Sequence, residues 1–61
     1  MKFRELEKLL KEAGWKYSYS TGSHYYYIHP TKPGKITIPY HPGKDLKPKT
    51  INSILKQAGL K

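Results

Sequence analysis

One stretch decides the fold of this chain: WKYSYSTGSHYYYI, residues 15–28. Aromatic and polar residues alternate over 15–20, which is typical of a strand with one buried face. The turn residues Thr21-Gly22-Ser23 come next, and the aromatic run over 24–29 predicts a second strand. Because so short a turn joins antiparallel strands, the stretch predicts a β-hairpin.

A third strand is expected after the hairpin. Residues 30–34 contain two prolines and a glycine, which indicates a loop. Lys35-Ile36-Thr37-Ile38 alternates polar and apolar side chains, and Pro39 ends the pattern. The three strands therefore make an antiparallel sheet. Its covered face is expected to hold Trp15, Tyr17, Ile36 and Ile38.

The second strand is ambiguous, because both of its faces are apolar enough to be buried. One alternative buries Tyr26 and Ile28 and leaves Tyr25 and Tyr27 in water. The other alternative reverses this arrangement. We favour the first, so Tyr25 and Tyr27 are expected on the open face of the sheet.

Helical patterns flank the strands on both sides. Apolar residues at helical spacing predict an amphipathic helix over 3–13, which Gly14 stops. A second helix begins at Pro48, since proline suits a first helical turn, and ends at Gly59. The apolar stripes of both helices are expected in the core: Phe3, Leu6, Leu9, Leu10 and Ala13, then Ile51, Ile54, Leu55 and Ala58.

These elements give the order α-β-β-β-α and one α+β domain over residues 1–61. An antiparallel sheet can leave one face in water, so both helices are expected on its other face. The chain has no cysteine, which excludes a disulfide framework and a thiolate zinc site. It shows no signal peptide and no apolar run of membrane-spanning length, so we expect a cytoplasmic protein without membrane contact.

The charge is strongly positive and unevenly spread. The chain has a net charge of +8, of which residues 14–61 carry +7 from eight lysines and Asp45. Residues 1–13 resemble an ordinary salt-bridged helix, with four bases and three acids. A basic domain with six tyrosines favours a polyanionic partner, and RNA above others. The alternative is that the charge only keeps a small domain soluble.

The triplet Gly22-Ser23-His24 is the strongest candidate for a reactive site. Histidine changes charge near neutral pH and serves most often as a general acid or base. RNA carries its own nucleophile, the 2′-hydroxyl, so its cleavage requires proton transfer and cations rather than a metal or another cofactor. The alternative is that His24 is simply an exposed residue at the start of a strand.

Other candidates are weaker. His29 and His41 each precede a proline, and each is either a second proton-transfer group or a solvated or locally bonded imidazole. A three-histidine metal site is disfavoured, because no short ligand spacing appears.

The RNA contacts expected from the sequence are lysines for the phosphates and tyrosines for base stacking. The lysines are Lys35, Lys44, Lys47 and Lys49, with Lys16 and Lys32 as outliers, and the tyrosines are Tyr25 and Tyr27.

The chain resembles the HicA toxin family, the small messenger-RNA-cleaving toxins (mRNA interferases) of prokaryotic toxin–antitoxin pairs. The resemblance rests on motifs along nearly the whole chain: Lys8-Leu9-Leu10, Ala13-Gly14-Trp15, Gly22-Ser23-His24, His29-Pro30, Ile36-Thr37-Ile38-Pro39, His41, Gly43-Lys44-Asp45-Leu46 and Ser53-Ile54-Leu55-Lys56-Gln57-Ala58-Gly59. The chain departs from the family at Tyr19 and Ile28, where members often carry a basic residue.

The resemblance implies a fold like that of double-stranded-RNA-binding domains. It also implies a metal-independent endoribonuclease with catalytic His24, which arrests translation as part of a stress response. Lys44 is the best phosphate-binding candidate by the same resemblance. The implied partners are mRNA and a HicB-type antitoxin that covers the active site, with the toxin alone monomeric. The alternative function is a non-catalytic RNA-binding module of the same fold.

Overall fold

A three-stranded sheet and two helices make up the fold, in the predicted order α-β-β-β-α. The structure is a computed structural model that describes residues 1–61. Its elements are α1 (Phe3–Glu12), β1 (Lys16–Thr21), β2 (His24–Ile28), β3 (Lys35–Pro39) and α2 (Pro48–Gln57). The predicted positions are confirmed to within one or two residues. Pro39 is the last residue of the third strand, whereas the sequence pattern placed it directly after the strand.

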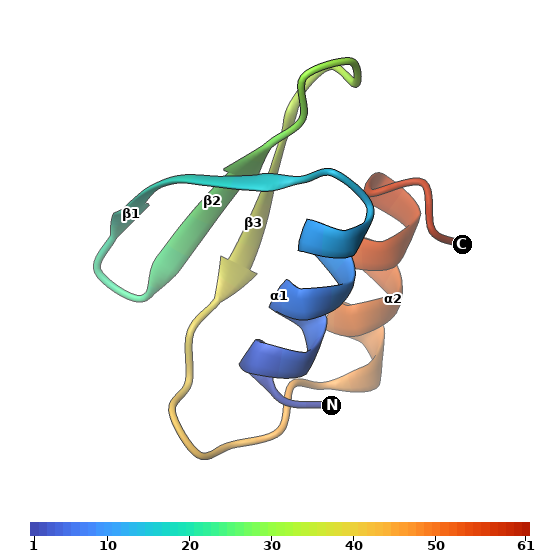
Figure 1. Cartoon of the computed structure of the whole chain (residues 1–61). Coiled ribbons are helices and arrows are strands. Elements are labelled where there is room, and N and C mark those ends of the chain that lie inside the picture. Colours follow the sequence, from blue (N-terminus) through green and yellow to red (C-terminus); the bar gives the residue numbers. More distant parts are fainter.

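The sheet has two unlike faces. Its strands lie in the order β1-β2-β3, and both neighbouring pairs are antiparallel. Helices α1 and α2 lie next to each other on one side of the sheet, as Figure 1 shows. No helix covers the other side. The predicted two-layer α+β architecture is therefore confirmed, and the uncovered side is called the open face below.

The core lies between the helices and the sheet. It consists of ten buried hydrophobic residues from α1, β2, β3, α2 and the segments that flank them, with none from β1: Phe3, Leu6, Leu10, Trp15, Tyr27, Ile36, Ile38, Leu46, Ile54 and Ala58. Leu6 and Leu10 are completely buried, as the helical spacing predicts, whereas Leu9 is 37% exposed. Truncating a fully buried leucine to alanine typically costs about 2–5 kcal/mol, which is large for so small a domain.

Both helices end in the same hydrogen-bonded motif, built on a glycine in the left-handed region. In α1 the Gly14 N–H donates to the Lys11 carbonyl at 3.0 Å, and the Trp15 N–H donates to the Leu10 carbonyl at 2.9 Å. This is the Schellman arrangement, which needs a residue with positive φ, and Gly14 has φ +97°. The motif turns the chain sharply, so that Trp15 enters the core at 2% exposure.

Strand β2 presents the opposite face from the one we favoured. Tyr27 is fully buried and Tyr25 packs against the core, whereas Ile28 is 48% exposed. The reason is register: Tyr27 pairs with Ile36 and Tyr25 pairs with Ile38, so all four side chains share one face. The preference for burying Tyr26 and Ile28 was therefore wrong.

Tyr27 is tolerated in the core because its hydroxyl has a partner. The hydroxyl donates a hydrogen bond to the Glu7 carboxylate, which reaches over from α1. Burial raises the pKa of the Tyr27 hydroxyl far above its ordinary value, and the bond to Glu7 raises it further. A buried ring with a satisfied polar tip costs little, so Tyr27 can occupy the core although it was expected in water.

A β-bulge separates two tyrosines of β1. Tyr17 pairs with Tyr27 but Tyr19 pairs with Tyr26, so the register shifts between them. The extra residue, Ser18, places Tyr17 on the helix side and Tyr19 on the open face. Tyr17 therefore lies on the predicted side, and its ring centroid is 5.7 Å from that of Tyr25. It nevertheless remains 47% exposed, because β1 is an edge strand.

No helix of the structure has the length and apolar character needed to span a bilayer.

Candidate nucleic-acid interface

His24 lies on the open face, at the end of the hairpin. It is the first residue of β2 and follows the turn in which Gly22 has φ +56°. Its cross-strand neighbours are Thr21 on β1 and Pro39 on β3. The imidazole is exposed and makes no hydrogen bond or ion pair with another protein group. Both ring nitrogens are therefore free to exchange a proton with a bound molecule.

The loop between β3 and α2 begins beside this histidine. The Tyr40 N–H donates to the Ser23 carbonyl at 2.7 Å, which continues the pairing of β3 with the hairpin turn. Pro39 and His24 are directly opposed in the ladder, and opposed Cα atoms are about 4.5–5.5 Å apart. Residues that follow Pro39 therefore start within reach of a ligand at His24.

A cationic cavity opens in this loop. It has a volume of about 390 Å³ and is lined by Pro39, His41, Lys44, Asp45, Leu46, Lys47 and Thr50. Lys44 and Lys47 supply two ammonium groups against the one carboxylate of Asp45. Pro39 lines this cavity and is also the residue of β3 that pairs with His24. The positive charge of the cavity suits a phosphate group.

A second cavity shares His41 with the first. It has a volume of about 330 Å³ and is lined by Lys2, Phe3, Arg4, Tyr40, His41, Pro42 and Gly43. Lys2 and Arg4 come from the start of α1, a segment whose balanced charge had indicated only a salt-bridged helix. No local sequence signal connects them with the loop. Only the tertiary fold brings them to His41.

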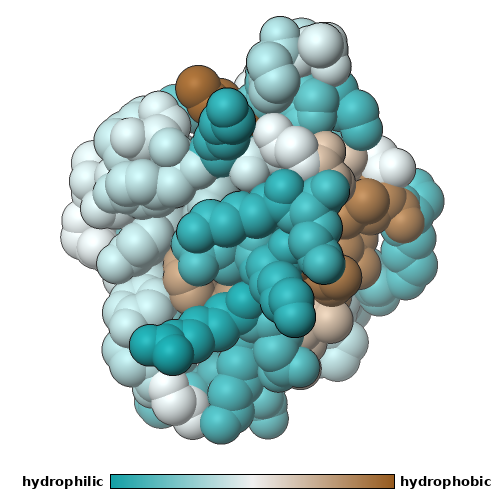
Figure 2. Space-filling view, in the orientation of Figure 1, coloured by the Kyte–Doolittle hydropathy of each residue, from teal (hydrophilic) through white to brown (hydrophobic).

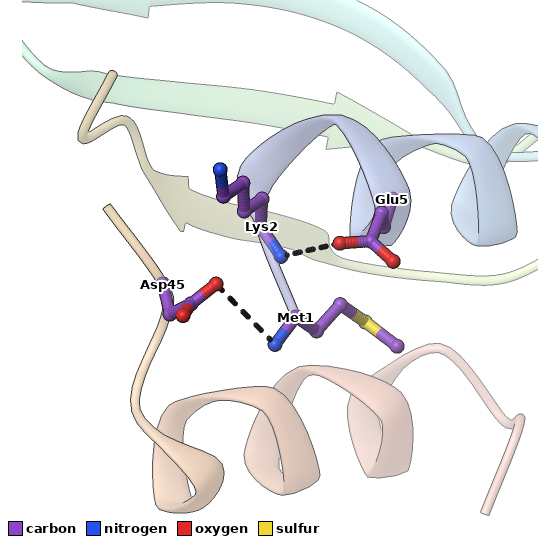
Figure 3. A network of polar contacts seen from close by, with 4 residues as sticks. All are labelled: Met1, Lys2, Glu5 and Asp45. Carbon is purple, nitrogen blue, oxygen red and sulfur yellow. Dashed lines mark hydrogen bonds and ion pairs between the residues drawn. The ribbon is translucent and has the colours of Figure 1, made fainter. Parts of the chain in front are cut away.

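Figure 3 shows how the N-terminal segment is attached to this loop. The Met1 ammonium lies 3.9 Å from an Asp45 carboxylate oxygen, and the Leu46 N–H donates to the Met1 carbonyl at 2.9 Å. The Lys2 N–H donates to the Glu5 carboxylate at 3.0 Å, which caps α1. These contacts fix the first turn of α1 against the loop.

The predicted phosphate-binding lysines do not form one group. Lys44 and Lys47 share a cavity, and Lys49 lies nearby in the first turn of α2 without lining it. Lys35 begins β3, four residues before Pro39, which is about 13 Å along a strand. The structure therefore brings Lys44 and Lys47 together in a cavity that Pro39 also lines, and leaves Lys35 at the other end of β3.

The two outlying lysines also differ in role. The Lys32 ammonium donates to the Ala58 carbonyl at 3.0 Å, a carbonyl at the C-terminal end of α2 to which the Trp15 indole also donates. Lys16 instead pairs with Ile28 across β1 and β2, which places it in the same cross-strand row as Lys35.

His29 is held by the fold. Its Nδ1 accepts hydrogen bonds from the Thr31 N–H at 3.1 Å and the Lys32 N–H at 3.2 Å. Its Nε2 lies 3.1 Å from the Ala13 carbonyl, so the ring hydrogen is on Nε2 and is donated there. The ring also packs edge-to-face on Trp15, with centroids 5.1 Å apart. The locally bonded alternative for His29 therefore describes the structure.

The two tyrosines expected to stack on RNA face the helices instead. Tyr27 has no exposed surface, and Tyr25 packs against the rings of Phe3 and Tyr40 at 5.1 Å each. Neither ring offers a free face on the open side of the sheet. Sequence reasoning missed both open-face tyrosines. It missed Tyr26 because it favoured the wrong face of β2, and Tyr19 because it could not locate the bulge at Ser18.

No group of three or more histidine, cysteine or acidic side chains is arranged to hold a metal ion.

Fold and site together define a small basic α+β domain with an exposed histidine at the rim of an open sheet, beside lysine-lined cavities. The family described as HicA toxin of bacterial toxin-antitoxin matches this chain over residues 3–60. The chain belongs to this family, as its sequence motifs predicted. It is therefore the toxin of a toxin–antitoxin pair, and its partner is an antitoxin. A comparison with curated proteins found no match.

Proposed function

We propose that this toxin is a metal-independent endoribonuclease that cleaves mRNA and thereby arrests translation, with His24 as general acid or base. One observation carries the proposal. His24 is exposed on the open face without a protein partner, and Pro39 opposite it lines the cavity that holds Lys44 and Lys47. Pro39 thus connects a free proton-transfer group with a cavity whose cations suit a phosphodiester.

The proposed reaction uses the nucleophile that RNA carries. A base removes the proton of a 2′-hydroxyl, and this oxygen attacks the adjacent phosphorus. The bond from phosphorus to the 5′-oxygen breaks, and that oxygen takes up a proton. The products are a 2′,3′-cyclic phosphate and a free 5′-hydroxyl. His24 performs one of the two proton transfers, a contribution that is typically worth about 10²–10⁴-fold in rate.

The cavity lysines have a separate role in this reaction. Charge accumulates on the phosphate oxygens as the new bond forms, and fixed cations stabilise that charge more strongly than water does. Lys44 and Lys47 come from a loop whose path is fixed by the contacts to Met1. We assign them to the scissile phosphate and its neighbour.

The partner antitoxin is expected to act by occlusion. An acidic surface that covers His24 and the cationic cavity would bind with favourable electrostatics and exclude RNA. We propose a HicB-type antitoxin that binds in this way, and a toxin that is monomeric without it.

Analysis of the product ends tests the proposal. A long unstructured RNA is incubated with the purified protein in excess EDTA, and the new ends are identified. Cleavage that leaves 2′,3′-cyclic phosphate ends is the expected result. A 3′-hydroxyl end, or cleavage that EDTA abolishes, would overturn the mechanism, since both indicate attack by a metal-bound water. RNA binding without any cleavage would leave a non-catalytic RNA-binding module of the same fold.

A further inference from the structure

The open face of the sheet carries a second group of side chains beyond His24. Register places the residues of this face in three rows: Thr21, His24 and Pro39, then Tyr19, Tyr26 and Thr37, then Lys16, Ile28 and Lys35. No helix covers them (Figure 1). In Figure 2, residues of intermediate hydropathy gather over the hairpin, whereas strongly hydrophilic residues cover α1.

Two tyrosines of the middle row form a rigid aromatic pair. The rings of Tyr19 and Tyr26 stack with centroids 4.5 Å apart and planes 20° apart. The Lys35 ammonium donates a hydrogen bond to the Tyr19 hydroxyl at 3.0 Å and lies 4.9 Å from the Tyr26 ring centroid. The pair is thus ordered before any ligand binds, while Tyr19 is still 44% exposed.

The open face around Lys35 carries positive charge that no acidic side chain neutralises, which favours an anionic ligand. Strands β1, β2 and β3 contain no aspartate or glutamate, and no acidic side chain pairs with Lys35. The hydrogen bond to Tyr19 raises the pKa of Lys35, so its ammonium stays charged. Exposed aromatic rings beside unneutralised cations fit a ligand that has both flat bases and phosphates.

We propose that Tyr19, Tyr26 and Lys35 form a subsite for single-stranded RNA, in which Tyr19 stacks on an unpaired base and Lys35 contacts a phosphate. The subsite rests on the proposed function in one respect, that the substrate is RNA. The bases of a duplex are stacked on one another and do not offer a face to Tyr19. The subsite therefore directs unpaired segments of mRNA to the histidine.

Its position relative to His24 is fixed by the ladder. Tyr26 lies two residues beyond His24 on the same face of β2, which is about 7 Å along the strand. A base stacked on the tyrosine pair therefore belongs to a nucleotide close to the phosphate at His24. The subsite and the histidine lie on one continuous surface with no element between them.

Binding measurements without cleavage test the subsite. The full chain carrying His24→Ala is titrated with a fluorescent, unstructured RNA oligonucleotide. Adding Tyr19→Leu is expected to weaken binding by about five- to 150-fold, since stacking on one base is typically worth about 1–3 kcal/mol. Tyr17→Leu is the matched control, because Tyr17 has similar exposure on the same strand but faces the helices. It should change the affinity less than twofold.

The phosphate contact is tested by salt. Lys35→Met keeps the aliphatic packing on the rings and removes the charge. It is expected to lower the slope of log affinity against log salt by about 0.7, the value for one contact with a single strand. The same RNA sequence closed into a duplex should bind Tyr19→Leu and its parent equally well.

Each other outcome overturns the subsite. Equal single-strand affinity for Tyr19→Leu and its parent does so, and so does an equal loss for Tyr17→Leu. A loss of antitoxin affinity with unchanged RNA affinity would make this face a protein interface instead. Because these assays do not depend on turnover, a protein that never cleaves RNA can still show the subsite. If the protein cleaves RNA and Tyr19→Leu binds RNA as tightly as its parent, the subsite is wrong while the proposed endoribonuclease function stands.

Discussion

Two histidines flank β2 in opposite circumstances: His24 is its first residue, and His29 directly follows its last. At one end His24 is exposed and has no protein partner, whereas at the other end His29 is bonded through both ring nitrogens. His29 also packs on Trp15, which in turn donates to the Ala58 carbonyl at 3.3 Å. The His29 end therefore joins α1, β2 and α2 into one unit.

The comparison shows that bonding partners, more than residue type, decide what a histidine does. A ring whose nitrogens are both engaged cannot exchange a proton with a ligand without breaking part of the fold. A free ring can do so at no structural cost. The His29 end thus supplies rigidity, and the His24 end is left available for a ligand.

The largest expected effect comes from removing the free histidine. His24→Ala is expected to lower the rate of RNA cleavage by about 10²–10⁴-fold, because one proton-transfer group is lost. The thermal unfolding midpoint should not change, since the ring makes no contact that the fold uses. Cleavage kinetics and a melting curve on the same sample check both statements. If His24→Ala still cleaves RNA at the parent rate, His24 is not the proton-transfer group, and the two histidines no longer differ in function.

Two glycine substitutions, one near each histidine, compare how much each region contributes to the free energy of unfolding. A Cβ at Gly14 would lie 2.7 Å from the His29 Nε2, whereas a Cβ at Gly22 would meet nothing within 4 Å. Both residues have positive φ. Gly14→Ala is expected to cost about 3 kcal/mol from backbone strain and displacement of His29, and Gly22→Ala about 1 kcal/mol from strain alone. Urea unfolding of both variants measures the difference, and equal costs would contradict it.

Removing the bonded histidine should have the reverse pattern from His24→Ala. His29→Ala is expected to lower the free energy of unfolding by about 1–2 kcal/mol. The Ala13 carbonyl and the N–H groups of Thr31 and Lys32 lose their hydrogen bonds to the ring and bond to water instead. The cleavage rate per folded molecule should be unchanged. Denaturant unfolding and kinetics at low temperature measure the two quantities. A folded variant without activity would make His29 a second proton-transfer group.

The smallest effect concerns the lysines near each end. Lys44 lines the cavity beside His24, whereas Lys56 is in the last turn of α2, near Ala58 and hence the His29 end. Lys44→Ala is expected to reduce the salt slope of RNA binding by about 0.7, and Lys56→Ala to leave it unchanged. Equal changes in both variants would mean that RNA binding depends on net charge and not on the cavity.

Some of the candidate site was predictable and some was not. The position of His24 at a hairpin end was predicted from the sequence, because a turn and a strand start place it there whatever the rest of the chain does. Lys44 was found by resemblance and Lys47 by charge. Lys2 and Arg4 were missed, because their place beside His41 depends on a loop that lies more than thirty residues away in the sequence.

The open-face tyrosines show the same limit more sharply. Tyr17 and Tyr19 are two residues apart and would share a face in a regular strand. The bulge at Ser18 separates them, and its presence depends on how β1 matches β2 over its whole length. A single shift in register exchanges every side chain between the two faces, so strand parity is a collective property.

The sequence by itself determined the element order, the glycine ends of both helices, the basic charge and the family, because these depend on local spacing, backbone preference and composition. Only the tertiary structure decided which face of β2 is buried, where the bulge falls, which histidine is bonded and which cations surround the free one. Those features depend on pairing and packing between distant segments, and no short window of sequence contains both partners.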